Sequence, residues 1–364
     1  MDEILISGYY GFKNSGDDAL LLSIINDLKK YKKDVRIVVL SSNPSETEKI
    51  YGVKSINRLN PFAIIPAMIR AKMLISGGGT LIQDGTSTKS LLYYLMIISI
   101  AKLFGLKVML YSNGVGPLKH EKNVERTRKV LNKVDLITLR DEASYKELQR
   151  IGVTKPETYL TADPAFTLVP SKKEIGRDIL SVMGADTSKK LLCISVRKWN
   201  ELGQNFAREI ADVVDYAVDK YDFYPVFLPM QLKMDYDISC AIREKMCNDA
   251  VVISEDLSTG DILSVIGNMD LCIGMRLHTL IYSASQAVPL IGIVYDPKVS
   301  GFMEYMKQDK YKSVEDFDEQ GLKELIDETM SDYDNIKAEL EKQMNVLKKK
   351  AEENAEYAAK LLEK

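Results

Sequence analysis

Apolar and polar positions divide most of the chain into two kinds of alternating segment. Short, nearly continuous apolar runs predict buried strands, and segments with apolar residues three or four positions apart predict helices between them. The strand-like runs of the first half are 3–8, 35–42, 71–78, 106–114 and 134–141. This rhythm is typical of a parallel sheet covered by helices.

The same rhythm restarts after a connecting stretch, 163–190, which carries Pro164, Pro170 and a charged helical segment. The strand-like runs of the second half are 190–197, 224–229, 250–255, 269–274 and 288–296. We therefore expect an α/β protein with two doubly wound, Rossmann-like domains, residues 1–170 and 171–330.

The segment 331–364 has the pattern of one long charged helix with a single apolar stripe. The stripe drifts with the 3.6-residue period of an α-helix and contains several alanines. This favours a helix that packs back on the body of the protein over a coiled-coil dimer.

Composition narrows the classes of function. The chain has 364 residues and a net charge of −3, so no global basic field attracts nucleic acid. Four scattered cysteines without a CxxC pair indicate a reducing cytoplasm and no zinc site. The N-terminus lacks the apolar region of a signal peptide, and the apolar run 91–101 is too short to span a bilayer. We expect a cytoplasmic protein in which 91–101 is a buried helix.

Ligands of open α/β sheets bind beyond the carboxyl ends of the strands, so residues just after strands are the first candidates. The segment 8–18 follows the first strand and offers Asn14, Asp17 and Asp18 as contacts for sugar hydroxyls. Asp17 could instead cap the next helix. The sequence leaves these two roles open.

A glycine run follows the third strand. Gly77, Gly78, Gly79 and Thr80 would let backbone amides approach an anion at a helix start. The alternative is a tight turn between a strand and a helix. Gln83 and the other polar residues that follow favour ligand contact.

The stretch GMRLHTLIY, 274–282, places Arg276 and His278 where a strand gives way to a helix. Helix amides and the helix dipole favour an anion there, and Arg276 adds a planar fork suited to a carboxylate or phosphate. A cation at a helix N-terminus is unfavourable unless an anion offsets it. For His278 the alternatives are a core histidine bonded to a carbonyl and a general acid beside that anion.

Arg197 follows a second-half strand and is expected near the same site. The alternative is an ion pair with Asp163 or Glu201. No metal-binding motif emerges, so we expect no metal.

Nine motifs together resemble the polysaccharide pyruvyl transferase family, most closely its bacterial branch that pyruvylates secondary cell-wall polymers. In order, from about residue 3 to about residue 305, they are SGYYGFKNSGDDAL, ISGGGTLIQDGTSTKSLLYYL, YSNGVGPL, LRDEAS, TADPAF, ISVR, FLPMQ, GMRLHTLIYSA and IVYDPKVSGF. Each motif alone is weak, and the set is specific.

The resemblance implies a fold like the GT-B glycosyltransferases, with two domains facing an active-site cleft. It implies transfer of pyruvate from phosphoenolpyruvate to two hydroxyls of a sugar, with release of phosphate and without cofactor or metal. The family's donor-binding and acid-catalytic element maps onto Arg276, Leu277, His278 and Arg197. Many relatives carry histidine after FLPM, whereas this chain carries Gln231, so no catalytic histidine can act there.

The resemblance also implies a lipid-linked glycan acceptor at the cytoplasmic face of the membrane. We expect the acceptor at 8–18 and 77–88, with Asp17 as a possible base. The segment 60–72, with Arg70 and Lys72, could touch the membrane or be an ordinary core helix. The rivals are a nucleotide-sugar glycosyltransferase of the same fold and a module that only binds a sugar or an anion.

Overall fold

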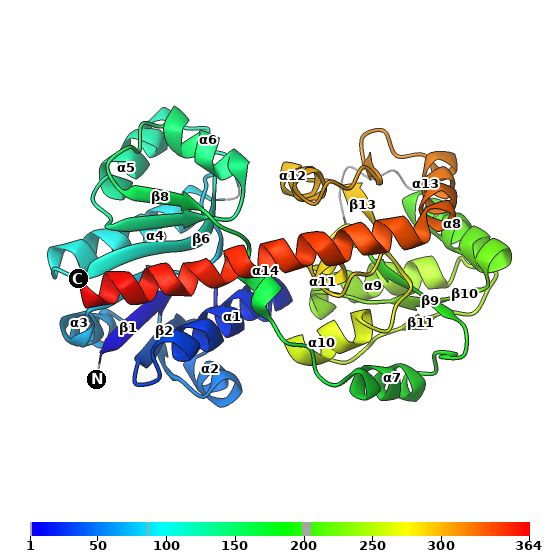
Figure 1. Cartoon of the computed structure of the whole chain (residues 1–364), viewed down its shortest axis with the longest axis horizontal. Helices are drawn as coiled ribbons and strands as arrows, with labels where there is room; N and C mark the ends of the chain where they lie inside the picture. The colour runs from blue at the N-terminus through cyan, green and yellow to red at the C-terminus, as the bar shows by residue number, and fades with distance from the viewer. Residues whose placement is uncertain (1, 86, 199–204) are drawn as a thin grey trace. The chain divides into compact units, whose positions relative to one another are not determined.

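The computed structural model describes residues 2–85, 87–198 and 205–364. It divides the chain into two compact units. The first is Met1–Leu168 together with Leu347–Lys364, and the second is Val169–Val346. Each unit is a parallel sheet with helices packed on it (Figure 1), which is the α/β class that the apolar runs predict.

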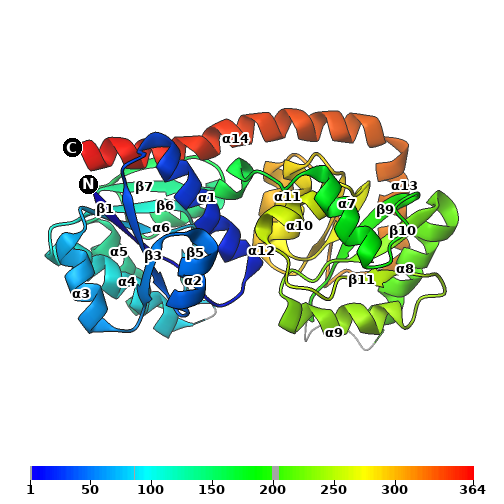
Figure 2. The same cartoon turned by 90° about the horizontal axis from the view of Figure 1, so that it is seen from below.

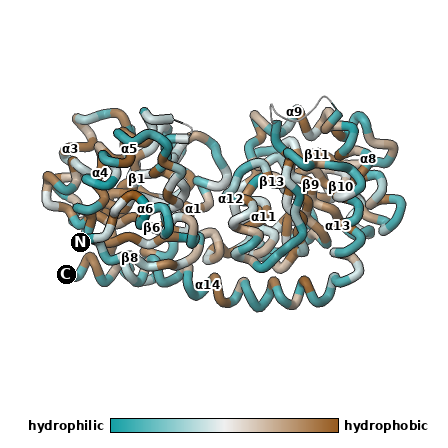
Figure 3. The backbone as a smooth tube through the Cα atoms, turned by 90° about the horizontal axis from the view of Figure 1, so that it is seen from above, coloured by the Kyte–Doolittle hydropathy of each residue, from teal (hydrophilic) through white to brown (hydrophobic). Residues whose placement is uncertain are grey.

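The first sheet has eight strands in the order β3-β2-β1-β4-β6-β7-β8, with β5 paired to β6. The strands are β1 (Glu3–Ser7), β2 (Arg36–Ser41), β3 (Lys54–Asn57), β4 (Met73–Ser76), β5 (Gly79–Ile82), β6 (Lys107–Val115), β7 (Leu136–Leu139) and β8 (Glu157–Leu160). Side chains alternate between two apolar cores: Leu5 faces one, and Ile4 and Ile6 face the other. Burial on both faces explains the continuous apolar runs (Figure 3).

The helices of the first unit connect these strands. They are α1 (Ser15–Tyr31), α2 (Pro44–Tyr51), α3 (Pro61–Arg70), α4 (Thr88–Leu103), α5 (Glu121–Leu131), α6 (Glu142–Arg150) and the short 3₁₀ helix η1 (Pro164–Thr167). α3 and α4 contribute Ile64 and Leu91 to the core on the Leu5 face. α1 contributes Leu21 to the core on the opposite face.

The second sheet has six strands in the order β11-β10-β9-β12-β13-β14. They are β9 (Lys190–Ser195), β10 (Phe223–Phe227), β11 (Val251–Val252), β12 (Leu271–Gly274), β13 (Leu290–Val294) and β14 (Tyr311–Ser313). The helices are α7 (Lys173–Val182), α8 (Phe206–Tyr221), α9 (Leu232–Arg243), α10 (Thr259–Ile266), α11 (Leu277–Ser285), α12 (Pro297–Tyr305) and α13 (Glu319–Ser331).

The last helix, α14 (Tyr333–Glu363), belongs to both units, because the division falls between Val346 and Leu347. Its final turns return to the first sheet, where Ala355, Ala358 and Leu361 join the core that contains α1. Among the helices of the described residues, none has the length and apolar character needed to cross a membrane.

Several elements of the fold differ from the sequence prediction. The strands β3, β8 and β14 were not predicted, because their residues are largely polar or partly exposed and form no apolar run. The apolar run 91–101 does form a helix, α4, but it is not buried on all sides: Leu92 and Met96 are exposed. The strand expected at 250–255 is reduced to β11.

Candidate active site

The second sheet brings the predicted donor-binding residues to one edge. β9 and β13 both pair with β12 in parallel. Arg197 follows β9, Arg276 follows β12, and Tyr295 follows β13. Because neighbouring parallel strands end at the same edge, these side chains start from adjacent points on the edge where α/β proteins bind ligands.

Arg276 occupies the N-cap position of α11. Its guanidinium forms a two-pronged ion pair with Asp235, with Nη2–Oδ1 at 2.6 Å and Nε–Oδ2 at 3.0 Å. Asp235 is fully buried in α9, and the Arg276 side chain is 16% exposed. The carboxylate of Asp235 offsets this cation at the helix N-terminus, so the charge of Arg276 does not by itself require a bound anion.

The ion pair fixes the orientation of the Arg276 guanidinium. Gln231 accepts a hydrogen bond from Nη2 at 3.4 Å, and its own backbone amide donates to Oδ2 of Asp235 at 3.1 Å. Within the described ranges, no residue accepts a hydrogen bond from the remaining nitrogen, Nη1. A guanidinium that is fixed in orientation and can still donate hydrogen bonds from one nitrogen is suited to binding an anion.

His278 lies in the first turn of α11, two residues after Arg276. Its ring centroid is 6.1 Å from that of Tyr282, one turn further along the helix. The side chain is partly exposed, and so is Leu277, which begins the helix. The structure therefore places His278 beside Arg276 and the helix N-terminus, where an anion would be favoured.

Arg197 is half-buried, and its guanidinium lies 4.7 Å from the centre of the Tyr295 ring. This cation–π contact holds the charge at the strand ends of the second sheet. Asp163, one of the two partners considered for Arg197, accepts a hydrogen bond from Nη1 of Arg140 at 2.8 Å. The other candidate partner, Glu201, lies outside the described residues.

The predicted acceptor residues lie at the carboxyl edge of the first sheet. Asn14 caps α1 by accepting a hydrogen bond from the Gly16 amide at 3.1 Å. Asp17 and Asp18 lie in the first turn of the helix and are partly exposed. The N-cap of α1 is therefore Asn14, and Asp17 does not have the capping role considered for it. An added Cβ on Gly79 would lie 3.2 Å from Oδ1 of Asp17, so this carboxylate lies beside the glycine run.

The glycine run does not start a helix, which corrects the sequence prediction. Gly79 begins the strand β5, and α4 begins only at Thr88. Thr80 is partly exposed within β5, and Gln83, also partly exposed, follows the strand. Gly77 and Gly78 connect β4 to β5, and Gly79 lies in β5, so the amides of this run lack a helix dipole behind them.

Close packing accounts for two of these glycines. A Cβ on Gly77 would lie 2.0 Å from the Tyr10 hydroxyl, and one on Gly78 would lie 3.2 Å from Cδ1 of Leu20. Gly79 has a φ of 91°, which side chains rarely adopt. The fold itself therefore requires Gly77 and Gly79, whatever they bind, whereas a side chain at Gly78 would require Leu20 to shift by a few tenths of an ångström.

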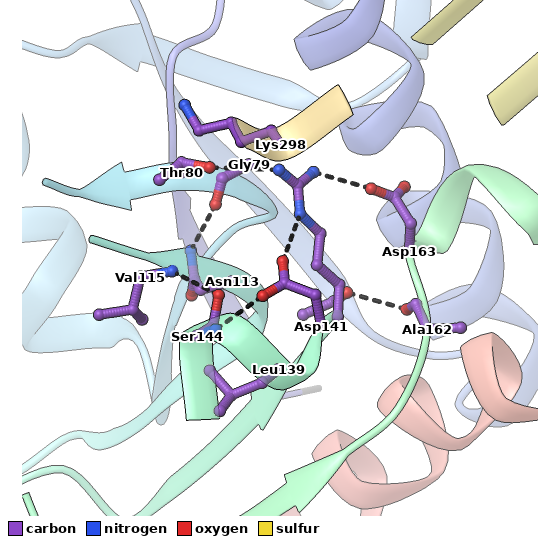
Figure 4. A network of polar contacts seen from close by, with 12 residues as sticks. Gly79, Thr80, Asn113, Val115, Leu139, Asp141, Ser144, Ala162, Asp163 and Lys298 are labelled. Carbon is purple, nitrogen blue, oxygen red and sulfur yellow. Dashed lines mark hydrogen bonds and ion pairs between the residues drawn. The ribbon is translucent and has the colours of Figure 1, made fainter. Parts of the chain in front are cut away.

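An ion-pair network that sequence analysis missed lies next to Thr80 (Figure 4). Arg140 follows β7, and its Nη1 binds Asp163 while its Nη2 donates to the Thr80 hydroxyl at 3.2 Å. Burial alone would lower the pKa of Arg140, but the charges of Asp163 and Asp141 outweigh burial and raise it. The network ties the ends of β5, β7 and β8 together.

Two further polar residues hold the same edge. Asn113 of β6 donates to the carbonyl oxygen of Gly77 at 2.8 Å. Asp84 accepts hydrogen bonds from the amides of Lys119 and His120 and from Asn123. Burial opposes ionisation of Asp84, but these hydrogen bonds outweigh it and lower its pKa. Asn113 lies near the end of β6 and Asp84 follows β5, but their partners are too far away in the sequence to be identified from spacing.

Within the residues that the structure describes, no group of three or more His, Cys, Asp or Glu side chains is arranged to hold a metal ion. The candidate residues described above are arginines, one histidine, carboxylates and residues that offer backbone amides.

Comparison with known sequences identifies the family. The model of the polysaccharide pyruvyl transferase family matches residues 14–297, which include every candidate residue from Asn14 to His278. The chain belongs to the polysaccharide pyruvyl transferase family. A relative of this pyruvyltransferase is the amylovoran biosynthesis protein AmsJ of Erwinia amylovora, 23% identical over 361 residues, with 84% of this chain and 86% of AmsJ covered.

Solved structures define the fold of this pyruvyltransferase more closely. S. aureus MnaA, solved with UDP, matches with a TM-score of 0.67 at 12% identity, covering 100% of this chain and 98% of MnaA. A glycosyltransferase from Rickettsia africae matches with a TM-score of 0.66 at 11% identity, covering 100% of this chain and 99% of the glycosyltransferase. The pyruvyltransferase therefore has a GT-B-like fold with two Rossmann-like sheets.

Proposed function

We propose that this pyruvyltransferase uses phosphoenolpyruvate as its donor and forms a pyruvate ketal across two hydroxyls of a sugar. The observation that carries the proposal is the placement of Arg197, Arg276 and His278 at adjacent strand ends of the second sheet. Phosphoenolpyruvate has two anionic groups, a carboxylate and a phosphate, which two arginines and the N-terminus of α11 can bind. This proposal needs no cofactor or metal.

His278 is the general acid of the proposed reaction. It donates a proton to the CH2 carbon of phosphoenolpyruvate, and the adjacent carbon then becomes electron-poor. One sugar hydroxyl attacks that carbon and forms the first C–O bond, and its proton passes to a base, for which we propose Asp17. The second hydroxyl forms the second C–O bond while the C–O bond to phosphate breaks, and the departing phosphate takes the proton of this hydroxyl. The products are the cyclic ketal and inorganic phosphate.

The proposed acceptor is a lipid-linked glycan precursor of a secondary cell-wall polymer, modified at the cytoplasmic face of the membrane. Asn14, Asp18, Thr80 and Gln83 support this proposal because they are partly exposed polar residues at the carboxyl edge of the first sheet. Their amide, hydroxyl and carboxylate groups suit the hydroxyls of a sugar. The amides of Gly77, Gly78 and Gly79 belong to the same proposed acceptor site.

Ligand-dependent thermal stability tests the donor assignment. We expect phosphoenolpyruvate to raise the melting temperature of the wild type, because a ligand that binds only the folded state stabilises it. Arg276→Gln should abolish this shift. Arg208→Gln, which changes an exposed arginine of α8, should retain it.

The same measurement addresses the rival function. The likeness to S. aureus MnaA with bound UDP and to a glycosyltransferase makes a nucleotide sugar the rival donor. A shift with UDP-glucose and none with phosphoenolpyruvate would replace the proposed reaction by glycosyl transfer.

A further inference from the structure

Exposed apolar side chains concentrate on one part of the first unit. Among the described residues, eight of the seventeen large apolar side chains that are exposed lie between 59 and 104. They are Leu59, Phe62, Ile65, Ile69, Leu92, Met96, Leu103 and Phe104. A concentration of this kind on a folded unit marks a surface that contacts something apolar.

The exposed residues of α3 form a stripe along one side of the helix. Phe62 is 88% exposed, Ile65 42% and Ile69 65%, and they are spaced three and four residues apart. The opposite side packs Ile64 and Met68 into the core. The helix is thus both a core-packing helix and one with an apolar outer face, so that the two alternatives for segment 60–72 are not exclusive.

α4 repeats the arrangement. Leu92, Met96 and Leu103 are exposed at helical spacing, whereas Leu91, Leu95 and Ile98 lie in the same core as the buried side of α3. α3 and α4 are neighbours on one face of the sheet (Figures 1 and 2). Because both helices bury one side against that face, their exposed stripes point away from the sheet together. We call these two stripes the α3–α4 face.

The chain segment that carries this face is rich in basic residues. Residues 54–120 contain eight Lys and Arg residues and a single acidic residue, Asp84, which is buried. α3 and α4 themselves carry Arg70, Lys89 and Lys102 and no acidic residue. Arg70 and Lys102 form ion pairs with Glu3 and Asp135, and Lys89 is exposed. The rest of the chain is acidic enough to give a net charge of −3.

We propose that the α3–α4 face docks this enzyme on an anionic lipid bilayer. Phenylalanine, leucine and isoleucine side chains of an interfacial helix insert at the boundary between headgroups and acyl chains, and basic residues beside them attract anionic lipids. A second copy of the chain is a poorer occupant, because pairing two such faces would bring basic residues together. The surface extends the proposed function, since a lipid-linked acceptor lies in the same bilayer.

Vesicle flotation without donor or acceptor tests the proposal. The wild type should float with vesicles of equal parts phosphatidylcholine and phosphatidylglycerol, and less with phosphatidylcholine alone. The double variant Phe62→Gln/Ile69→Gln should lose at least about tenfold in vesicle affinity, because it lacks two apolar side chains whose transfer from water to the bilayer favours binding. Val182→Gln is the matched control, since Val182 is 81% exposed in the second unit, and it should bind as the wild type does.

Because Phe62 and Ile69 are exposed, their substitution should not disturb the packing of the core. Equal melting temperatures of the wild type and the variants will check this. The proposal would be overturned if the wild type did not bind anionic vesicles, or if the double variant bound them with the affinity of the wild type. A wild-type dimer that the double variant turns into a monomer would do so too, by assigning the face to a second copy. Because no phosphoenolpyruvate is present, these outcomes are independent of the proposed reaction.

Discussion

At the scale of single residues, the candidate donor site depends on a partner that the sequence did not indicate. Arg276 and His278 were identified from their position between a strand and a helix, and the structure places them there. Asp235, which holds Arg276, is 41 residues away in the chain, and only the pairing of the strands brings α9 to α11. Local pattern identifies residues at strand ends but not which of them meet.

Asp235→Asn tests whether Asp235 positions Arg276. The amide keeps the shape of the side chain but removes the charge that orients the guanidinium. We expect KM for phosphoenolpyruvate to rise by about tenfold or more, since misplacing a binding group by a fraction of an ångström weakens binding and catalysis. The value of kcat should change less, and Asp235→Glu should recover part of the loss. Steady-state kinetics of phosphate release measures this.

A purely structural Asp235 would give a different result. In that case Asp235→Asn would lower the melting temperature and leave KM for phosphoenolpyruvate unchanged. The variant Asp212→Asn is a suitable control, because Asp212 is a more exposed carboxylate paired with Arg208 on α8.

At the scale of helices and strands, periodicity predicted the buried elements well and the others poorly. The runs that became β1, β2, β4, β6 and β9 are buried along most of their length, which produces the apolar signal. The strand β5 begins with Gly79, which lowers strand propensity, so the chain there was expected to turn into a helix. Pairing with β6, rather than local preference, holds this segment in a strand.

The junction of α1 with η1 gives a prediction about pH. Asp27 of α1 is buried and accepts a hydrogen bond from the Thr167 hydroxyl at 2.7 Å. Burial raises its pKa to about 6, although the Thr167 hydrogen bond opposes the shift. The folded state therefore binds this proton more tightly than the unfolded state, whose pKa is about 3.9. The free energy of unfolding should fall as pH rises from about 4 to about 6, by up to about 3 kcal/mol from this group.

Asp27→Asn removes the ionisable group and keeps an acceptor for Thr167. Relative to the wild type, the variant should be more stable at pH 8 and lose this part of the pH dependence. Denaturant unfolding at several pH values measures the difference. Asp34→Asn, at an exposed carboxylate, should follow the wild type at every pH. Equal pH profiles for wild type and Asp27→Asn would contradict the assignment.

At the scale of the whole molecule, one chain builds two sheets of the same kind and places different chemistry on each. The first unit carries carboxylates, an asparagine and a glycine run at its carboxyl edge, and the second carries two arginines and a histidine. The family match spans both sets of residues. The proposed division between sugar binding and donor binding rests on these two compositions.

The most direct test is phosphate release from phosphoenolpyruvate in the presence of a lipid-linked glycan, with the mass of the glycan measured before and after. The wild type should release phosphate and add one pyruvyl ketal per phosphate. His278→Ala should slow release by at least about a hundredfold, the typical contribution of a general acid, and Arg208→Gln should not. Release that persists unchanged in His278→Ala, or transfer of a glycosyl group from UDP-glucose instead of pyruvate, would contradict the account.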